Sequence, residues 1–108
     1  MKKIEAIIKP YKLDGVKDVL TRMTIHGATL SEVRMQSRPR AYHDLGYGEE
    51  FEPKIKLEMV VTDEQKGDAV EAILHAAQTG RVGDGKIFVF DICEAIRIRT
   101  GEHGAEAV

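Results

Sequence analysis

The 108-residue sequence predicts an α+β fold, because strand-like and helix-like segments alternate along it. The period of the apolar residues changes from two to about 3.6 and back, and it does so twice. The two halves that show this change, 1–36 and 54–92, are similar to tandem copies of one βαβ unit. Hydrophobic residues make up 43% of the chain, which is enough for one small core. We therefore expect a single domain over residues 1–108.

The first half is expected to form a strand, a helix and a second strand. Residues 1–9 alternate loosely and are rich in isoleucine, which favours a strand that ends before Pro10. A helix is predicted over 13–24, because apolar residues recur at helical spacing: Leu13, Val16, Val19, Leu20 and Met23. Gly27 is a stop signal for this helix, and residues 28–36 alternate again as a strand.

A long loop is expected between the halves, over residues 37–52. This stretch has no sustained apolar period, and it contains two glycines, one proline and many charges. A structureless segment of this length is unusual in so small a domain, and such segments are commonly functional. The loop is therefore a candidate recognition element, and a tip without a role is the alternative.

The second half repeats the pattern of the first. After Pro53, residues 54–62 alternate cleanly as a strand. Thr62 or Asp63 can cap a helix over 64–77, whose predicted inner face consists of Val70, Ile73, Leu74 and Ala77. A last strand is expected over 86–98, followed by a polar tail, 100–108.

Together these elements fit a ferredoxin-like βαββαβ sandwich, with four antiparallel strands, two helices on one face and the long loop between strands 2 and 3. The other face of the sheet would then need a cover. Apolar residues point to both faces of the first strand, as at Ile4, Ala6, Ile7 and Ile8. Homo-oligomerisation would supply that cover.

Composition limits the classes of function. The net charge is −2, with 16 basic and 18 acidic residues, which gives no support for general nucleic-acid binding. The single cysteine, Cys93, lies in an apolar run and is expected to be a small buried side chain. No apolar leader follows the first residues, and no stretch is long enough for a membrane span. We expect a cytoplasmic protein without membrane insertion.

The stretch Gly83-Asp84-Gly85-Lys86 is the strongest functional signal. Glycines let backbone N–H groups approach a ligand closely, and successive N–H groups in a turn form an anion site. Lys86 adds a charge suited to phosphate, and alternation would place Arg97 and Arg99 on one strand face. The pattern indicates a polyphosphate site, although an ordinary turn would look the same. It lacks the spacing of a P-loop.

Three separated blocks resemble the PII signal-transduction family, small trimeric regulators of nitrogen and carbon metabolism. The opening MKKIEAIIKPYKLDGVKDVL, the segment TGRVGDGKIFVFDI and the segment IRIRTGE each match a family block, in order. The similarity covers residues 1–36 and 53–102.

The resemblance implies a homotrimer that binds ATP or ADP in clefts between neighbouring subunits, and binding of AMP is left open. Arg97 and Arg99 would reach the phosphates from the adjacent subunit. The residues that the resemblance assigns to the nucleotide are Ile7, Gly27, Thr29, Arg38, Glu58, Val60, Gly83, Asp84, Gly85, Lys86, Arg97 and Arg99.

The long loop corresponds to the family's T-loop but departs from it. It is about four residues shorter, Gly46 stands where the family has a modified tyrosine, and Pro39 stands where it has a metal-binding glutamine. Proline has neither a side-chain acceptor nor an N–H donor, so 2-oxoglutarate is expected to bind poorly, and Mg²⁺ with ATP is left open. Effector or partner contacts are assigned to Arg38, Arg40, Tyr42, Tyr47 and Lys54, and no metal site is predicted.

The functional expectation is a regulatory binding protein and not an enzyme. It would sense ATP and ADP and signal through its loop to an ammonium channel, a sensor kinase or a metabolic enzyme. The alternative is a relative that serves carbon or another pathway and binds a different small effector. A nucleotide hydrolase and a structural or metal-tolerance protein of similar fold are further rivals.

Overall fold

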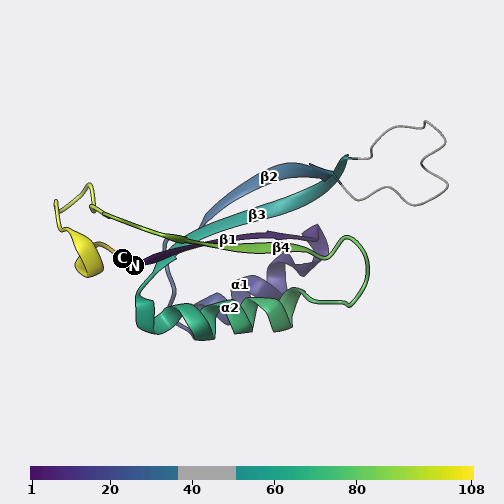
Figure 1. Cartoon of the computed structure of the whole chain (residues 1–108), viewed down its shortest axis with the longest axis horizontal. Coiled ribbons are helices and arrows are strands. Elements are labelled where there is room, and N and C mark those ends of the chain that lie inside the picture. The colour runs from purple at the N-terminus through teal and green to yellow at the C-terminus, as the bar shows by residue number, and fades with distance from the viewer. Residues whose placement is uncertain (37–50) are drawn as a thin grey trace.

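The computed structural model describes residues 1–36 and 51–108 and confirms the predicted order of strands and helices (Figure 1). The elements are β1 (Lys2–Ile8), η1 (Pro10–Lys12), α1 (Leu13–Arg22), β2 (Thr29–Gln36), β3 (Phe51–Val61), α2 (Asp63–Ala77), β4 (Gly85–Asp91) and η3 (Gly104–Ala107), where η marks a 3₁₀ turn. The segment that enters β4 and the C-terminal segment lie at opposite ends of the molecule (Figure 1).

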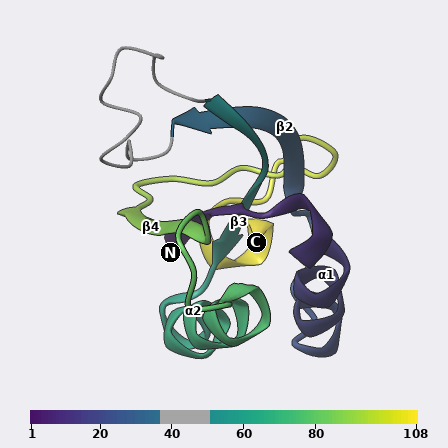
Figure 2. The ribbon, with the colours of Figure 1, turned by 90° about the vertical axis from the view of Figure 1, so that its right-hand side faces the viewer.

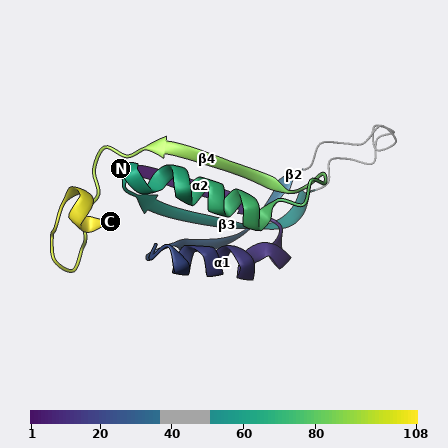
Figure 3. The same ribbon diagram turned by 90° about the horizontal axis from the view of Figure 1, so that it is seen from below.

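The four strands form one antiparallel sheet in the order β2-β3-β1-β4. β1 is central, so that its residue Ile7 pairs with Lys56 of β3 on one side and with Lys86 of β4 on the other. Both helices cover the same face of this sheet (Figure 2 and Figure 3). The predicted ferredoxin-like sandwich is confirmed.

The core lies between that face and the two helices. Alternate residues of β1 supply one side of it, because successive side chains of a strand point to opposite faces. The helices supply the other side at the spacing of an amphipathic helix. The most deeply buried side chains are Ile4, Ala6, Ile8, Val16, Val61, Ala69 and Ile73.

Helix α2 begins at a complete capping box. The Thr62 hydroxyl accepts from the backbone N–H of Gln65, and the Gln65 side chain accepts from the backbone N–H of Thr62. The predicted inner face is right for Ile73 and Ala77 but wrong for Leu74, which is 47% exposed. Leu74 follows Ile73 by one position, about 100° around the helix, and lies at the margin beside β4.

Strand β3 begins earlier than predicted. It starts at Phe51, so the last two residues of the expected 37–52 loop belong to the sheet. Pro53 lies inside the strand and pairs with Arg34 of β2. Proline is tolerated there because β1 ends opposite Ile55, which leaves β3 with one neighbour at this point and an open edge on the other side.

Strand β4 is shorter than the predicted 86–98 and ends at Asp91, its last residue opposite β1. Past that point no strand remains to pair with, and the chain leaves the sheet. Arg97 and Arg99 therefore do not share a strand face; they lie in or beside a turn closed by the Gly101 N–H and the Arg97 carbonyl, 2.7 Å apart. Cys93 is exposed, not buried as expected.

The face of the sheet away from the helices mixes charged and aromatic side chains. Lys3 and Lys56 alternate with Glu5 and Glu58 in three ion pairs with N–O distances of 3.0 to 3.6 Å: Lys3 with Glu58, and Lys56 with both Glu5 and Glu58. Phe88 pairs with Glu5 in register, and Lys3 lies 5.0 Å from the centre of the Phe90 ring. In the described part of the chain, no helix is long and apolar enough to cross a membrane.

Candidate functional site

The glycine loop that leads into β4 has a backbone that requires glycine. Gly83 and Gly85 have φ values of +90° and +107°, which L side chains rarely adopt. A Cβ at Gly85 would lie 1.7 Å from the Ile7 carbonyl oxygen. Gly85 therefore lets the loop approach β1 closely and enter the sheet, and Lys86 follows immediately, exposed to solvent.

Asp84 folds back onto the start of this loop. Its carboxylate accepts hydrogen bonds from the backbone N–H groups of Thr79 and Gly80, both at 2.9 Å, and from the Thr79 hydroxyl. The Lys9 ammonium lies 3.1 Å from the same carboxylate. These donors, led by the Thr79 hydroxyl and the Thr79 N–H, hold the pKa of Asp84 well below its ordinary value.

Lys54 holds the other side of the loop. Its side chain is 5% exposed, and its ammonium donates to the Gly83 carbonyl oxygen at 2.5 Å. The Glu52 carboxylate lies 3.6 Å from the same ammonium. Lys54 also lines a cavity of about 350 Å³ that extends from Gln36 to Lys86, so the base of the long loop and the glycine loop border one space.

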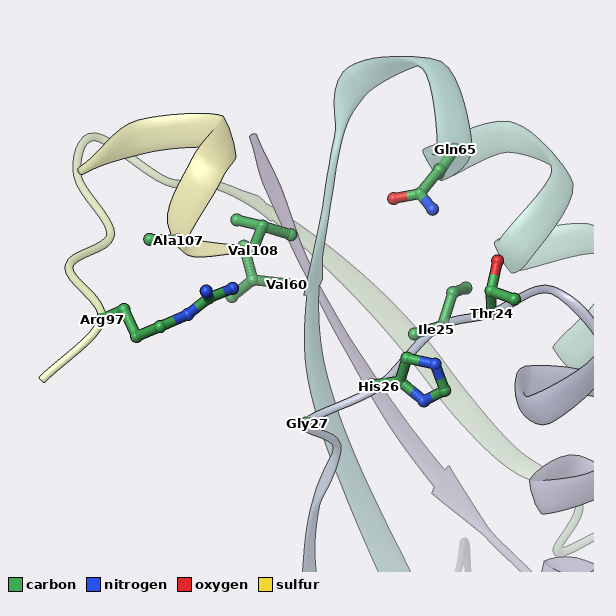
Figure 4. A pocket seen from close by; sticks show the side chains of 9 residues that line it. All are labelled: Thr24, Ile25, His26, Gly27, Val60, Gln65, Arg97, Ala107 and Val108. Atoms are coloured by element: carbon green, nitrogen blue, oxygen red, sulfur yellow. The ribbon is translucent and has the colours of Figure 1, made fainter. Parts of the chain in front are cut away.

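A second group of predicted residues surrounds two neighbouring cavities at the tail end of the sheet. Gly27, Val60 and Arg97 line a cavity of about 320 Å³ together with the C-terminal residues (Figure 4). Thr29 and Glu58 line the adjacent cavity, of about 340 Å³, which Gly27 and Val60 share. Lys3 donates to the Glu58 carboxylate and is the main reason that the pKa of Glu58 is lowered.

A local turn holds Arg97. The Arg97 guanidinium lies 3.1 Å from the Glu102 carboxylate, and the Arg97 backbone N–H donates to the Glu102 carbonyl oxygen at 2.9 Å. The Thr100 hydroxyl donates to the same carboxylate at 2.8 Å. Arg99 lies within this turn and is exposed. Two cationic side chains are thus presented at the tail end, away from the glycine loop.

The predicted nucleotide residues therefore fall into two groups, one at each end of the sheet. Ile7 lies opposite Lys86 in β4, whereas Lys3 lies opposite Val60 in β3. Ile7 and Lys3 are four residues apart on β1, which corresponds to ~13 Å along the strand. Arg97 lies beyond the end of β4. One copy of the chain does not bring Lys86 and Arg97 to the same side of one cavity.

Four predicted residues lie outside the described ranges: Arg38, Arg40, Tyr42 and Tyr47. The sequence interpretation gave no role to Thr79 or Lys9, both of which contact Asp84. Thr79 opens the quoted segment TGRVGDGK, and its five-residue spacing from Asp84 was the available signal. Lys9 carried no signal of its own, because its contact depends on the fold.

Comparison with known proteins identifies the family. The model for "Nitrogen regulatory protein P-II" matches residues 1–102. The chain belongs to the P-II family. It is 53% identical to the nitrogen regulatory protein P-II of Pasteurella multocida, 53% identical to that of Rhodospirillum rubrum and 48% identical to the nitrogen regulatory protein P-II 1 of Escherichia coli. Each alignment covers all of both chains.

Family membership confirms the resemblance found in the three sequence blocks. The alignments span 112 positions against the 108 residues of this chain, so at least four positions have no counterpart here. The expected T-loop, about four residues shorter than usual, would account for that difference. The relatives carry the names of regulatory proteins and not of enzymes.

Proposed function

We propose that this P-II protein is a cytoplasmic regulator in nitrogen metabolism that binds ATP and ADP in clefts between the subunits of a homotrimer. The observation that carries the proposal is the division of the candidate residues between the two ends of the sheet. In a ring of copies, the glycine-loop end of one subunit would meet the tail end of the next, and one cleft would then contain both groups.

The chemistry of the two groups supports this division. Gly83, Gly85 and Lys86 offer backbone N–H groups and an exposed ammonium for phosphates. The neighbour's Arg97 and Arg99 would add planar cations that suit phosphate oxygens. Gly27 and Val60 border a cavity with both polar and apolar lining, which fits an adenosine moiety. Because both subunits would contact the ligand, nucleotide and assembly would stabilise each other.

The protein would act by binding and not by catalysis. Nucleotide exchange would shift the populations of loop conformations, and the loop would report them to an ammonium channel, a sensor kinase or a metabolic enzyme. The cavity lined by Lys54 and the glycine loop would connect the nucleotide to the long loop, because Gln36, the last residue of β2 before that loop, also lines it. The same cavity, with Pro39 and Gly46 in the loop sequence, favours the alternative of a different small anionic effector of a carbon or other pathway.

The test is calorimetry with ATP, ADP and AMP, each with and without Mg²⁺. Lys86→Ala is expected to weaken ATP binding by about tenfold or more, because it removes a charge-assisted hydrogen bond. Lys17→Ala is the matched control, since Lys17 is an exposed lysine on α1 that lines none of the three cavities described above. Equal affinities of wild type and Lys86→Ala would refute the nucleotide site.

Assembly and effector binding need separate measurements. Light scattering at micromolar concentration should give the mass of a trimer, and the mass of a monomer would contradict the shared cleft. Titration of 2-oxoglutarate into the Mg·ATP complex should show weak binding that hardly strengthens ATP binding. Tight binding with rising ATP affinity would mean that another residue replaces the missing glutamine.

A further inference from the structure

We infer that Lys9 and Thr79 are positioning residues, which act through Asp84 to hold the glycine loop in the conformation that receives phosphate. This inference rests on the proposed nucleotide site and adds to it two residues: Thr79, at the start of the loop, and Lys9, which contacts the loop from the end of β1. It also assigns Asp84 a role inside the loop and not against the ligand.

The first step is the geometry around the Asp84 carboxylate. Four donors surround it: the backbone N–H groups of Thr79 and Gly80, the Thr79 hydroxyl and the Lys9 ammonium. Lys9 also lies 3.4 Å from the Thr79 hydroxyl, so that these three side chains are in mutual contact. The side chains of Lys9 and Asp84 are only 16% and 23% exposed.

The second step concerns what Asp84 can do for an anion. A carboxylate accepts hydrogen bonds and repels phosphate, so it cannot itself bind a phosphate group. With its oxygens already occupied by four donors, its effect is on the loop backbone. The lowered pKa of Asp84 agrees with a carboxylate that stays ionised inside this set of donors.

The third step is the span of chain that the contacts close. Asp84 joins the residues just after α2 to the residue just before β4, and Lys9 ties both to the end of β1. Lys54 fixes the Gly83 carbonyl oxygen from β3. The loop between Gly80 and Gly85 is thus anchored at both ends. Its backbone is already restricted before phosphate binds, so binding costs less conformational entropy.

The experiment compares Thr79→Val, which keeps the shape and removes the hydroxyl, with Thr79→Ser, which keeps the hydroxyl. Lys9→Met and Lys9→Arg make the same comparison for the ammonium. Thr21→Val is the matched control, because the Thr21 hydroxyl bonds only within α1, to the Lys17 carbonyl oxygen. Each variant is titrated by calorimetry with ATP, ADP and adenosine, and each is melted without nucleotide.

Thr79→Val and Lys9→Met should each weaken ATP binding by about three- to tenfold, since each removes side-chain contacts to Asp84 that hold the loop. Thr79→Val also removes the acceptor of the Arg81 N–H. The loss should be largest for ATP, smaller for ADP and absent for adenosine, which has no phosphate. Thr79→Ser and Lys9→Arg should recover most of the affinity. Thr21→Val should behave as wild type.

Two results would overturn the inference. Wild-type ATP affinity in Thr79→Val and Lys9→Met, alongside a loss in Lys86→Ala, would leave the nucleotide site standing and remove the positioning role. An equal loss for ATP, ADP and adenosine would mean that the contacts serve the fold alone. Unchanged affinity in Lys86→Ala would instead reject the nucleotide site itself, so the two failures are distinguishable. Lys9 and Thr79 are independent tests if one variant does not fold.

Discussion

The two ends of the sheet are built differently. At the glycine-loop end, which comprises residues 79–86 with Lys9 and Lys54, the contacts join segments far apart in sequence. At the tail end, which comprises residues 24–29, Val60 and 95–108, the contacts of Arg97 with Glu102 stay within one turn. Ile98 lies in that turn with 99% of its surface exposed.

This difference shows that, within the described ranges, contacts between distant segments of one chain hold the glycine-loop end, whereas they do not hold the tail-end turn. Long-range contacts to buried or half-buried lysines fix the glycine loop within one copy. Local contacts hold the tail-end turn, but nothing in the described residues covers Ile98 or the half-exposed Ile96. Exposed apolar side chains of this kind commonly mark a contact with another molecule. The glycine-loop end has an exposed apolar side chain of its own, Val82, at 69%. The proposed trimer would bring the two ends together and could cover the apolar side chains of both.

Gly85→Ala should break the glycine-loop end most severely. The new Cβ would overlap the Ile7 carbonyl oxygen at 1.7 Å, and the φ of +107° would be strained in addition. We expect the free energy of unfolding to fall by ~3 kcal/mol or more, because β1 and β4 must separate to admit the methyl group. Urea unfolding followed by circular dichroism measures this loss.

Gly67→Ala is the control for that variant. Gly67 lies exposed in α2 with nothing within 4 Å of an added Cβ, so alanine should raise the free energy of unfolding by ~1 kcal/mol through helix propensity. Similar effects of the two glycine variants would contradict the close approach at Gly85.

Lys54→Met against Arg97→Met tests the two ends directly. The Lys54 side chain is buried, so its loss leaves the Gly83 carbonyl oxygen without a hydrogen-bond donor. This should lower the free energy of unfolding by ~1–3 kcal/mol. Loss of Arg97 breaks a pair whose side chains are each 38% exposed, and should cost ~0–1 kcal/mol. Thermal melts without nucleotide provide both values, and a reversed order would show that the tail end is the more tightly held.

Sequence periodicity was sufficient to predict the layers of the fold. The helical spacing of Val16 and Leu20 and the alternation of Ile4, Ala6 and Ile8 identify the core faces directly. Element ends were less predictable where pairing partners decide them. β4 stops at Asp91 because β1 supplies no further partner, although the sequence beyond Asp91 stays apolar enough for a strand.

The candidate site was predictable in its residue types and not in its arrangement. Glycine, lysine and arginine at Gly83, Lys86 and Arg97 suit phosphate by their chemistry alone. Their separation to two ends of the sheet depends on strand order, which local patterns do not encode. The contacts of Lys9 and Lys54 were unpredictable for the same reason, since each joins residues that only the fold brings together.

Acid should weaken the glycine-loop end through protonation of Asp84. The pKa of Asp84 is lowered in the folded chain, chiefly by the Thr79 hydroxyl and N–H, so the folded state binds this proton less readily than the unfolded state does. The resulting stability is present above the ordinary carboxyl value, ~3.9, and is lost as pH falls towards the folded pKa. Melting temperatures of wild type and Asp84→Asn should differ by a constant amount above about pH 5 and converge below about pH 4. A constant difference down to pH 2 would mean that Asp84 is not held ionised by these donors.

Thr24→Gly should give the smallest change, and in the opposite direction. Thr24 has a φ of +54° and is exposed just after α1, so the tail end places a β-branched residue in a backbone region where the glycine-loop end uses glycine. Glycine would remove strain of ~1–2 kcal/mol, offset by ~0.5–1 kcal/mol for its greater freedom in the unfolded chain. Loss of the Thr24 hydroxyl bond to the Met23 carbonyl oxygen costs little, because that carbonyl can bond to water at an exposed turn. The net expectation is a rise of ~0.5 kcal/mol in the free energy of unfolding.

Thr24→Val separates the backbone strain from the hydroxyl bond, since valine keeps the branched side chain, loses the hydroxyl and should lower the free energy of unfolding. A fall in stability for Thr24→Gly as well would show that the hydroxyl, and not the backbone strain, controls this turn.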